Sequence, residues 1–176
     1  DRIDFSNETV SANNLLLSQA RSALAALSGG ASYRISGSRN YGYFGGGFST
    51  PPSIYHSTVD RLDFSNETFS SPGDDLSQGR NAIAAVSSSS YGYFGGGYSS
   101  PPNTYYGTVD RIDFSNETLS LPGNDLPQAR AGLAAVSTSS YGYFGGGYST
   151  PPATYHCTID RLDFSNETIS DIGDLS

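Results

Sequence analysis

Two histidines, two tyrosines and one cysteine are the residues of this chain best suited to redox chemistry. His56, Tyr106 and His156 occupy one repeated position, and Tyr155 and Cys157 flank the last of them. Nitrogen and sulfur ligands of this kind suit copper. The two histidines belong to separate repeats, however, and no group of ligands occurs at short spacing. The sequence therefore predicts no metal site, no cofactor and no enzyme activity, with a copper-radical oxidase as the last of three alternatives.

Arginine supplies all nine cationic residues, against seventeen acidic residues, and the net charge is −8. The arginines stand singly beside acids, so the sequence excludes a phosphate-binding face and a nucleic-acid partner. A planar guanidinium group suits partly buried pairing with carboxylates. We therefore expect ion pairs between neighbouring blades, that is, from the sheet of one repeat to the sheet of the next. The arginines concerned are Arg21, Arg80 and Arg130 at one repeated position, and Arg61, Arg111 and Arg161 at another.

The acids beside these arginines are the carboxylates that a calcium ion would need. Asp110, Asp113 and Glu117 lack the ligand spacing of a calcium loop, so we expect a solvated face instead. Cys157 takes the position that serine and glycine hold in the other repeats, which predicts a small, half-buried residue rather than a reactive thiol. A single cysteine also cannot form an internal disulfide.

The tripeptide Asn-Glu-Thr occurs four times and matches the acceptor site for an N-linked glycan. The four asparagines are Asn7, Asn66, Asn116 and Asn166. The same tripeptide suits a hairpin turn, because asparagine tolerates a positive φ. We expect a turn at each site, and a glycan as well if the source of the protein can glycosylate.

These residues recur because the chain repeats itself almost verbatim. DRIDFSNETV begins at residue 1, DRLDFSNETF at 60, DRIDFSNETL at 110 and DRLDFSNETI at 160. A period near 50 residues is typical of units that bury their faces only against neighbours, as in propellers and solenoids. We expect one array over residues 1–176, with repeats 1–59, 60–109 and 110–159 and a partial repeat 160–176.

The first repeat carries an insertion between Leu27 and Tyr41, with the composition of a loop. Tyr33, Arg34 and Arg39 lie in it and have no counterparts in the other repeats. We expect this loop to protrude and to contact a neighbouring subunit or another partner.

Four short strands account for the rest of each repeat. In the last repeat they are expected at 131–137, 141–148 and 156–164 and directly after the turn at 165–168, where bulky and small or polar residues alternate. Residues 17–27 are the only helical competitor, but the equivalent segment of the next repeat contains a glycine and β-branched residues, which favours a strand. The apolar runs are far shorter than the ~20 residues of a membrane helix.

The sequence YGYFGGGYSSPPNTYYGTVDRIDFSNETLSLPGNDLPQARAGLAAVS resembles a kelch repeat. A glycine motif follows an aromatic strand, a strand ending in aspartate and an aromatic residue leads to a turn, and a small-residue strand completes the unit. The usual tryptophan is replaced by Phe69, Leu119 and Ile169, and the glycine doublet is a triplet. Near-verbatim repetition also resembles repeat proteins of environmental bacteriophages and aquatic bacteria. The resemblance implies an all-β fold of four-stranded antiparallel β-propeller blades, whose crowded inner strands favour small residues.

Counting strands gives three blades and an orphan N-terminal hairpin, which cannot close a ring of ~4 to 8 blades. We expect identical or homologous repeat units as partners, either in a longer chain or head to tail, since Asp1 and the absence of methionine indicate a mature or internal segment. The first functional hypothesis is a structural or adhesive part of an extracellular filament, fibre or virion appendage. The second is a carbohydrate- or protein-binding module using the tyrosine-rich loop at residues 149–155.

Overall fold

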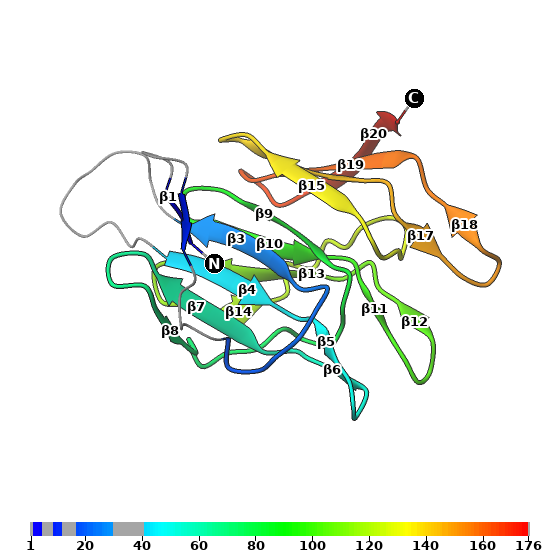
Figure 1. Cartoon of the computed structure of the whole chain (residues 1–176). Helices are drawn as coiled ribbons and strands as arrows, with labels where there is room; N and C mark the ends of the chain where they lie inside the picture. The colour runs from blue at the N-terminus through cyan, green and yellow to red at the C-terminus, as the bar shows by residue number, and fades with distance from the viewer. Residues whose placement is uncertain (1, 5–8, 12–16, 30–40, 176) are drawn as a thin grey trace.

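The computed structural model describes residues 2–4, 9–11, 17–29 and 41–175 (Figure 1). Every regular element in this part of the chain is a β-strand, and no helix that could cross a membrane occurs there. Twelve of the strands form three four-stranded antiparallel sheets, which confirms the predicted fold class. The predicted contact residues Tyr33, Arg34 and Arg39, and also Asn7, lie outside the described residues.

Each of the three sheets is a simple up-and-down meander in chain order. The first contains β3 (Ala25–Gly29), β4 (Tyr41–Gly45), β7 (Val59–Asp63) and β8 (Thr68–Ser70). The second contains β9 (Ala84–Ser87), β10 (Tyr91–Gly95), β13 (Val109–Asp113) and β14 (Leu119–Ser120). The third contains β15 (Ala134–Ser137), β16 (Tyr141–Gly145), β19 (Thr158–Asp163) and β20 (Ile169–Asp174). A unit below means one sheet with the segment leading into it: 17–70, 71–120 and 121–175.

The sheets stack face to face, with β9 lying between β3 and β15. These three strands are the small-residue segments, and the lack of bulk lets neighbouring sheets approach. Residues 17–24, the start of the helical competitor, are not helical, and β3 follows them. The three sheets form an open array and not a closed ring, as expected from the strand count.

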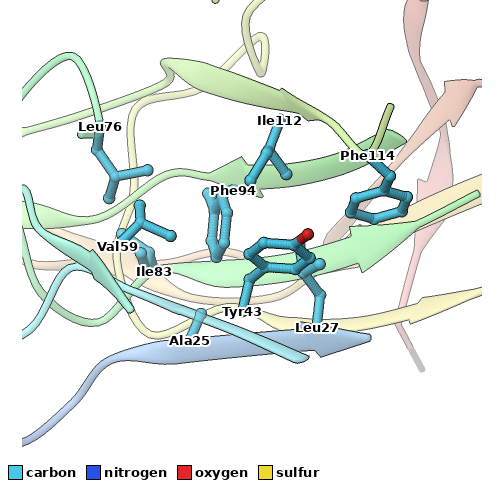
Figure 2. Packing of buried hydrophobic residues seen from close by; sticks show 9 residues of the cluster. All are labelled: Ala25, Leu27, Tyr43, Val59, Leu76, Ile83, Phe94, Ile112 and Phe114. Atoms are coloured by element: carbon cyan, nitrogen blue, oxygen red, sulfur yellow. The ribbon is translucent and has the colours of Figure 1, made fainter. Parts of the chain in front are cut away.

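Alternation along the glycine-rich strands places side chains on both faces of each sheet. In β10, Gly92 and Phe94 face the first sheet, where Gly92 lies against Leu27. Tyr93 and Gly95 face the third sheet. Each sheet therefore needs a neighbour on either side. Figure 2 shows the core that results between the first two sheets, made by Ala25, Leu27, Tyr43, Val59, Leu76, Ile83, Phe94, Ile112 and Phe114.

Smaller hairpins accompany the sheets. β1 (Arg2–Asp4) pairs with β2 (Thr9–Ser11) and is the predicted N-terminal hairpin. The proline-containing segments, expected from the sequence to be loops, form a two-stranded hairpin in each unit. These hairpins are β5 (Phe48–Ser49) with β6 (Ile54–Tyr55), β11 (Tyr98–Ser99) with β12 (Thr104–Tyr105), and β17 (Tyr148–Ser149) with β18 (Thr154–Tyr155).

Candidate functional site

At the junction between the first two units, an arginine, a tyrosine and a glutamate form a polar contact next to two stacked aromatic rings. We call this set of contacts the seam. Arg61 of β7 donates from Nη1 to Oε1 and Oε2 of Glu117 in the second unit, at 2.9 and 2.8 Å. The hydroxyl of Tyr43 donates to the same carboxylate at 3.0 Å. The ring of Tyr43 stacks on Phe114 with centroids 5.5 Å apart. The hydrogen bond to Glu117 is the main cause that raises the pKa of the Arg61 guanidinium, so Arg61 keeps its positive charge at neutral pH.

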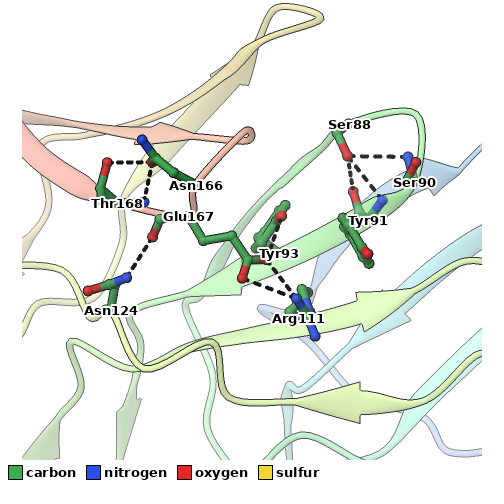
Figure 3. Close-up of polar contacts among 9 residues, drawn as sticks. All are labelled: Ser88, Ser90, Tyr91, Tyr93, Arg111, Asn124, Asn166, Glu167 and Thr168. Carbon is green, nitrogen blue, oxygen red and sulfur yellow. Dashed lines mark hydrogen bonds and ion pairs between the residues drawn. The ribbon is translucent and has the colours of Figure 1, made fainter.

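The second junction repeats the first almost contact for contact (Figure 3). Arg111 Nη1 donates to both carboxylate oxygens of Glu167 at 2.9 and 3.1 Å, and the Tyr93 hydroxyl donates to Glu167 at 3.0 Å. Tyr93 stacks on Phe164 at 5.4 Å. Burial is the main cause that raises the pKa of the Tyr93 hydroxyl, so this group stays protonated and acts as a donor. The seam is a structural device repeated at both junctions between the three units.

Glycines provide the apolar half of each seam. A Cβ on Gly45 would lie 2.9 Å from Cε1 of Phe94, and a Cβ on Gly95 would lie 3.0 Å from Cε1 of Phe144. Both distances are shorter than real Cβ atoms ordinarily allow. The phenylalanine ring of one sheet therefore packs directly on the glycine of the preceding sheet. Each sheet needs both residues for these contacts, which explains why the YGYFGGG segment is repeated.

The connector arginines make a second set of ion pairs. Arg80 Nη2 lies 2.5 Å from Oδ2 of Asp110, and both side chains are buried. Its backbone N–H donates to the carbonyl of His56 in the first unit, so the connector is bonded to both units. The equivalent pairs are Arg21 with Asp60 at 2.7 Å and Arg130 with Asp160 at 2.6 Å. These arginines thus bind aspartates of their own blade and not of a neighbouring one, and the backbone of the connector joins the units.

The predicted solvated face is wrong for Asp110, which is 1% exposed and belongs to one of these pairs. Glu117 is also largely covered, because Arg61 lies on it. The physical reason is that a completely buried guanidinium needs a buried counter-charge. A regular spacing could have revealed these pairs, since thirty residues separate Arg80 from Asp110 and Arg130 from Asp160.

One of the three buried pairs is less well satisfied than the others. Asp110 Oδ1 accepts a hydrogen bond from the backbone N–H of Ser77 at 3.0 Å. Pro127 occupies the equivalent position in the third unit and has no N–H. Asp160 Oδ1 is accordingly buried without a hydrogen-bond partner among the described residues.

Arg161 is the one predicted ion-pair residue of the second set that the structure places differently. Its guanidinium lies over the Tyr141 ring, 4.8 Å from the centroid, as Arg61 and Arg111 lie over Tyr41 and Tyr91. Within the described residues it makes no ion pair with a carboxylate. Arg161 belongs to the last sheet, where no described unit follows.

The small hairpins lie next to one another along one edge of the array (Figure 1). Their aromatic rings form a continuous row. Contacts within hairpins join Phe48 to Tyr55 and Tyr98 to Tyr105, both at 5.0 Å between centroids. Contacts between hairpins join Tyr55 to Tyr98 at 5.9 Å and Tyr105 to Tyr148 at 5.8 Å. Tyr155 ends the row and is 87% exposed. We call this set of rings the aromatic row: Phe48, Tyr55, Tyr98, Tyr105, Tyr148 and Tyr155.

The sequence predicts the aromatic row only in part. It predicts that the tyrosine-rich loop at 149–155 is exposed and aromatic, and Tyr155 in that loop is exposed. The alignment of hairpins from three units could not be read from any one loop, because it depends on how the sheets stack.

The histidines lie at the base of these hairpins. His56 Nε2 is 2.8 Å from Ser49 Oγ, and His156 Nε2 is 2.9 Å from Ser149 Oγ. Tyr106 uses its hydroxyl for the same bond, to Ser99. Burial, followed by the positive charge of Arg21, lowers the pKa of His56. No three His, Cys, Asp or Glu side chains of the described residues are grouped to hold a metal ion. Cys157 is exposed, so its predicted half-burial is wrong.

The Asn-Glu-Thr segments form turns at exposed tips. Asn66 Oδ1 accepts hydrogen bonds from the backbone N–H and the hydroxyl of Thr68, and Asn166 does the same for Thr168. The residue with positive φ is the glutamate, at 58°, 62° and 59° in the three described copies, so the expectation of a left-handed asparagine is wrong. This backbone conformation turns the glutamate away from the exposed tip and into the seam. Asn66, Asn116 and Asn166 are all exposed.

A polar groove between the last two units is lined by serines and two tyrosines, among them Ser88, Ser90, Tyr91, Ser140 and Tyr141. Ser88 Oγ already accepts hydrogen bonds from the backbone N–H groups of Ser90 and Tyr91 (Figure 3). Thr138 makes the same turn in the third unit. These hydroxyl groups therefore serve the hairpin turns.

No protein-family model and no curated protein sequence matches this chain. The resemblance to kelch repeats thus stands on the sequence motifs alone.

Proposed function

We propose that this chain is a structural or adhesive repeat protein, a kelch-like array that forms part of an extracellular filament, fibre or virion appendage. The observation that carries the proposal is the duplicated seam. Tyr43, Arg61 and Glu117 at one junction do what Tyr93, Arg111 and Glu167 do at the next. The repeated charged and aromatic residues are thus used to join units, and stability in such arrays grows with each added neighbour.

The proposal includes identical or homologous repeat units as partners. An open antiparallel array with apolar end faces associates unless something covers those faces. Electron microscopy and light scattering on the purified chain test this directly. Elongated or ring-shaped assemblies are expected, and a monodisperse 18.5 kDa monomer at all concentrations would contradict the proposal.

The extracellular or virion-surface location is part of the same proposal and is supported by the resemblance to surface repeat proteins. An antibody against the chain should label intact cells or particles of the source without permeabilisation. Labelling that occurs only after lysis would reject this location and leave the architecture untouched.

Carbohydrate binding is the second candidate function, because the aromatic row presents rings to solvent. Aromatic rings bind the apolar faces of sugars, and Tyr148 and Tyr155 are the exposed end of the row. A glycan array probed with the chain and with Tyr155→Ala tests the idea. Leu121→Ala is the matched control, since Leu121 is an exposed apolar side chain outside the row. Equal binding by both variants would reject the row as a sugar platform.

A further inference from the structure

The outer face of the third sheet carries the residue types that form the two buried junctions, at the equivalent positions of the repeat. No described unit packs against this face. We call it the end face, and its members are Val136, Tyr143, Gly145, Arg161 and Leu175. An apolar groove runs through it, lined by residues of β15 and β16 together with Ile159 and Leu175.

The apolar members of the end face are equivalent to residues that the next unit covers elsewhere. Val86 is 3% exposed because it packs against Gly142 of the third unit, whereas its counterpart Val136 is 69% exposed. A Cβ on Gly145 would meet nothing nearer than Ile159 Cγ1 at 3.9 Å. Its counterpart Gly95 has Phe144 directly above it. The end face thus has a site for a phenylalanine ring and a side chain that fits a glycine.

The polar members are equivalent in the same way. Arg111 and Tyr93 share the carboxylate of Glu167. Arg161 and Tyr143 hold the same strand positions, opposite each other in the register of β16 and β19. Neither is bonded to a carboxylate among the described residues. They form a site for a glutamate from a further unit.

The C-terminal segment already follows the path of the connectors between units. Leu76 donates its backbone N–H to Ser57, and Leu126 donates to Gly107. Leu175 donates in the same manner to the carbonyl of Cys157, at 2.7 Å. In the first two units this path leads directly into the sheet that covers the face. At the end face Leu175 itself is 52% exposed, against 4% for Leu126.

We propose that the end face binds a further unit of the same repeat, joined in cis after the connector segment that contains Leu175. The bound unit places a phenylalanine over Gly145, a glycine against Val136 and a turn glutamate between Arg161 and Tyr143. A second copy of the chain fits less well. It would offer Glu67 as the glutamate, and Glu67 already has an interaction within its own chain. The proposal rests on the proposed repeat architecture and names the partner of one surface.

The test appends a second copy of residues 128–176 after residue 176 and compares urea unfolding of the original and extended chains. The extension should raise the urea midpoint, and amide exchange in β15 should become roughly tenfold or more slower, because adjacent units stabilise each other. Gly145→Ala should leave the original chain nearly unchanged and lower the midpoint of the extended chain. Gly95→Ala is the positive control and should lower both.

Arg161→Gln provides a second variant that does not depend on steric fit, and it should lower the midpoint of the extended chain alone. An extension that fails to change β15 exchange, or Gly145→Ala and Arg161→Gln effects equal in both chains, would overturn the proposal. The original chain can associate through its uncovered end face, but an extended chain that still forms concentration-dependent dimers, which Val136→Asp abolishes, would overturn the proposal in favour of a second copy. If the extended chain behaves as expected but forms no assemblies, the filament function fails and the cis partner stands.

Discussion

Replacing Asp110 by asparagine should destabilise the chain by about 3–5 kcal/mol, the usual cost of leaving one member of a buried ion pair without its partner. The substitution keeps the shape of the side chain and removes its charge. The Arg80 side chain has no solvent exposure, so water cannot replace the lost carboxylate. A typical domain has only about 5–15 kcal/mol of total stability, so the loss is a large share of it.

The expected loss of stability depends on the hydrogen bonds that Arg80 still makes in the Asp110→Asn variant. Nε still donates to the carbonyl of Gly96 at 2.8 Å, and Nη2 to that of Phe94 at 3.4 Å. These neutral acceptors satisfy hydrogen bonds without neutralising the guanidinium. Asparagine can accept only one of the two hydrogen bonds that Asp110 accepts from Ser77 and Arg80, so the loss combines the uncompensated charge with one lost hydrogen bond.

The double variant Arg80→Met with Asp110→Asn separates these two causes. It removes the buried charge as well, so it should be more stable than Asp110→Asn alone, although the Gly96 carbonyl then loses its donor at about 1 kcal/mol. Urea unfolding followed by circular dichroism gives the free energies and the slope m. Asp174→Asn, at an exposed carboxylate of β20, is the matched control and should stay within about 0.5 kcal/mol of the parent chain.

Two outcomes would contradict the explanation by a buried charge. If Asp110→Asn unfolds within about 1 kcal/mol of the parent with the same m, the charge is not buried in solution. If the double variant loses as much stability as the sum of both single variants, the uncompensated charge is not the cause of the loss.

Other residues of the array allow three shorter tests. His56→Tyr introduces the residue that the second unit has at this position, and it should make the chain less sensitive to acid. Burial lowers the pKa of His56, so its neutral form stabilises the fold above about pH 6.5. This stabilisation is lost as the pH falls through the lowered pKa. Unfolding at pH 7 and pH 5 measures it, and equal losses in both chains would contradict it. Pro127→Ser should raise stability by about 1 kcal/mol by giving Asp160 Oδ1 a backbone donor, and no gain in urea would count against that bond. Ala82→Gly should stabilise by up to about 1 kcal/mol, because Ala82 has φ 52° where the third unit uses glycine; a lower thermal midpoint would disprove it.

The strands could be predicted because their patterning is local. β10 and β16 have the sequence Tyr-Gly-Tyr-Phe-Gly, so each face of the strand carries a bulky ring and a glycine, as expected of a strand buried on both faces. Repetition added a second constraint, since any interpretation of one unit had to hold for all. On that ground the sequence favours a strand over a helix at 17–27. The structure has no helix there, but the strand β3 begins only at Ala25, so the predicted strand is wrong for 17–24.

The small hairpins and the orientation of the turn glutamates escaped prediction for different reasons. Strands as short as β5 or β11 contain two residues, too few for a pattern to emerge. The turn itself was predicted, but asparagine is the general favourite for positive φ, and here the glutamate adopts it. Contact with Arg61 and Tyr43 explains this choice, and that contact lies in another unit.

The repeat, its strands, its turns and the open array follow from the amino-acid order alone, because they depend on patterns within about 50 residues and on counting. The partners of individual side chains emerge only in the tertiary structure: which carboxylate of its own unit neutralises Arg80, which ring of the next sheet covers Gly95, and which rings meet along the aromatic row. A charged or aromatic side chain has the same local pattern whether it faces water or another unit. The fold of one unit brings Arg80 to Asp110, 30 positions away, and stacking of the sheets brings Tyr93 to Glu167, 74 positions away; burial then gives each pair its energy.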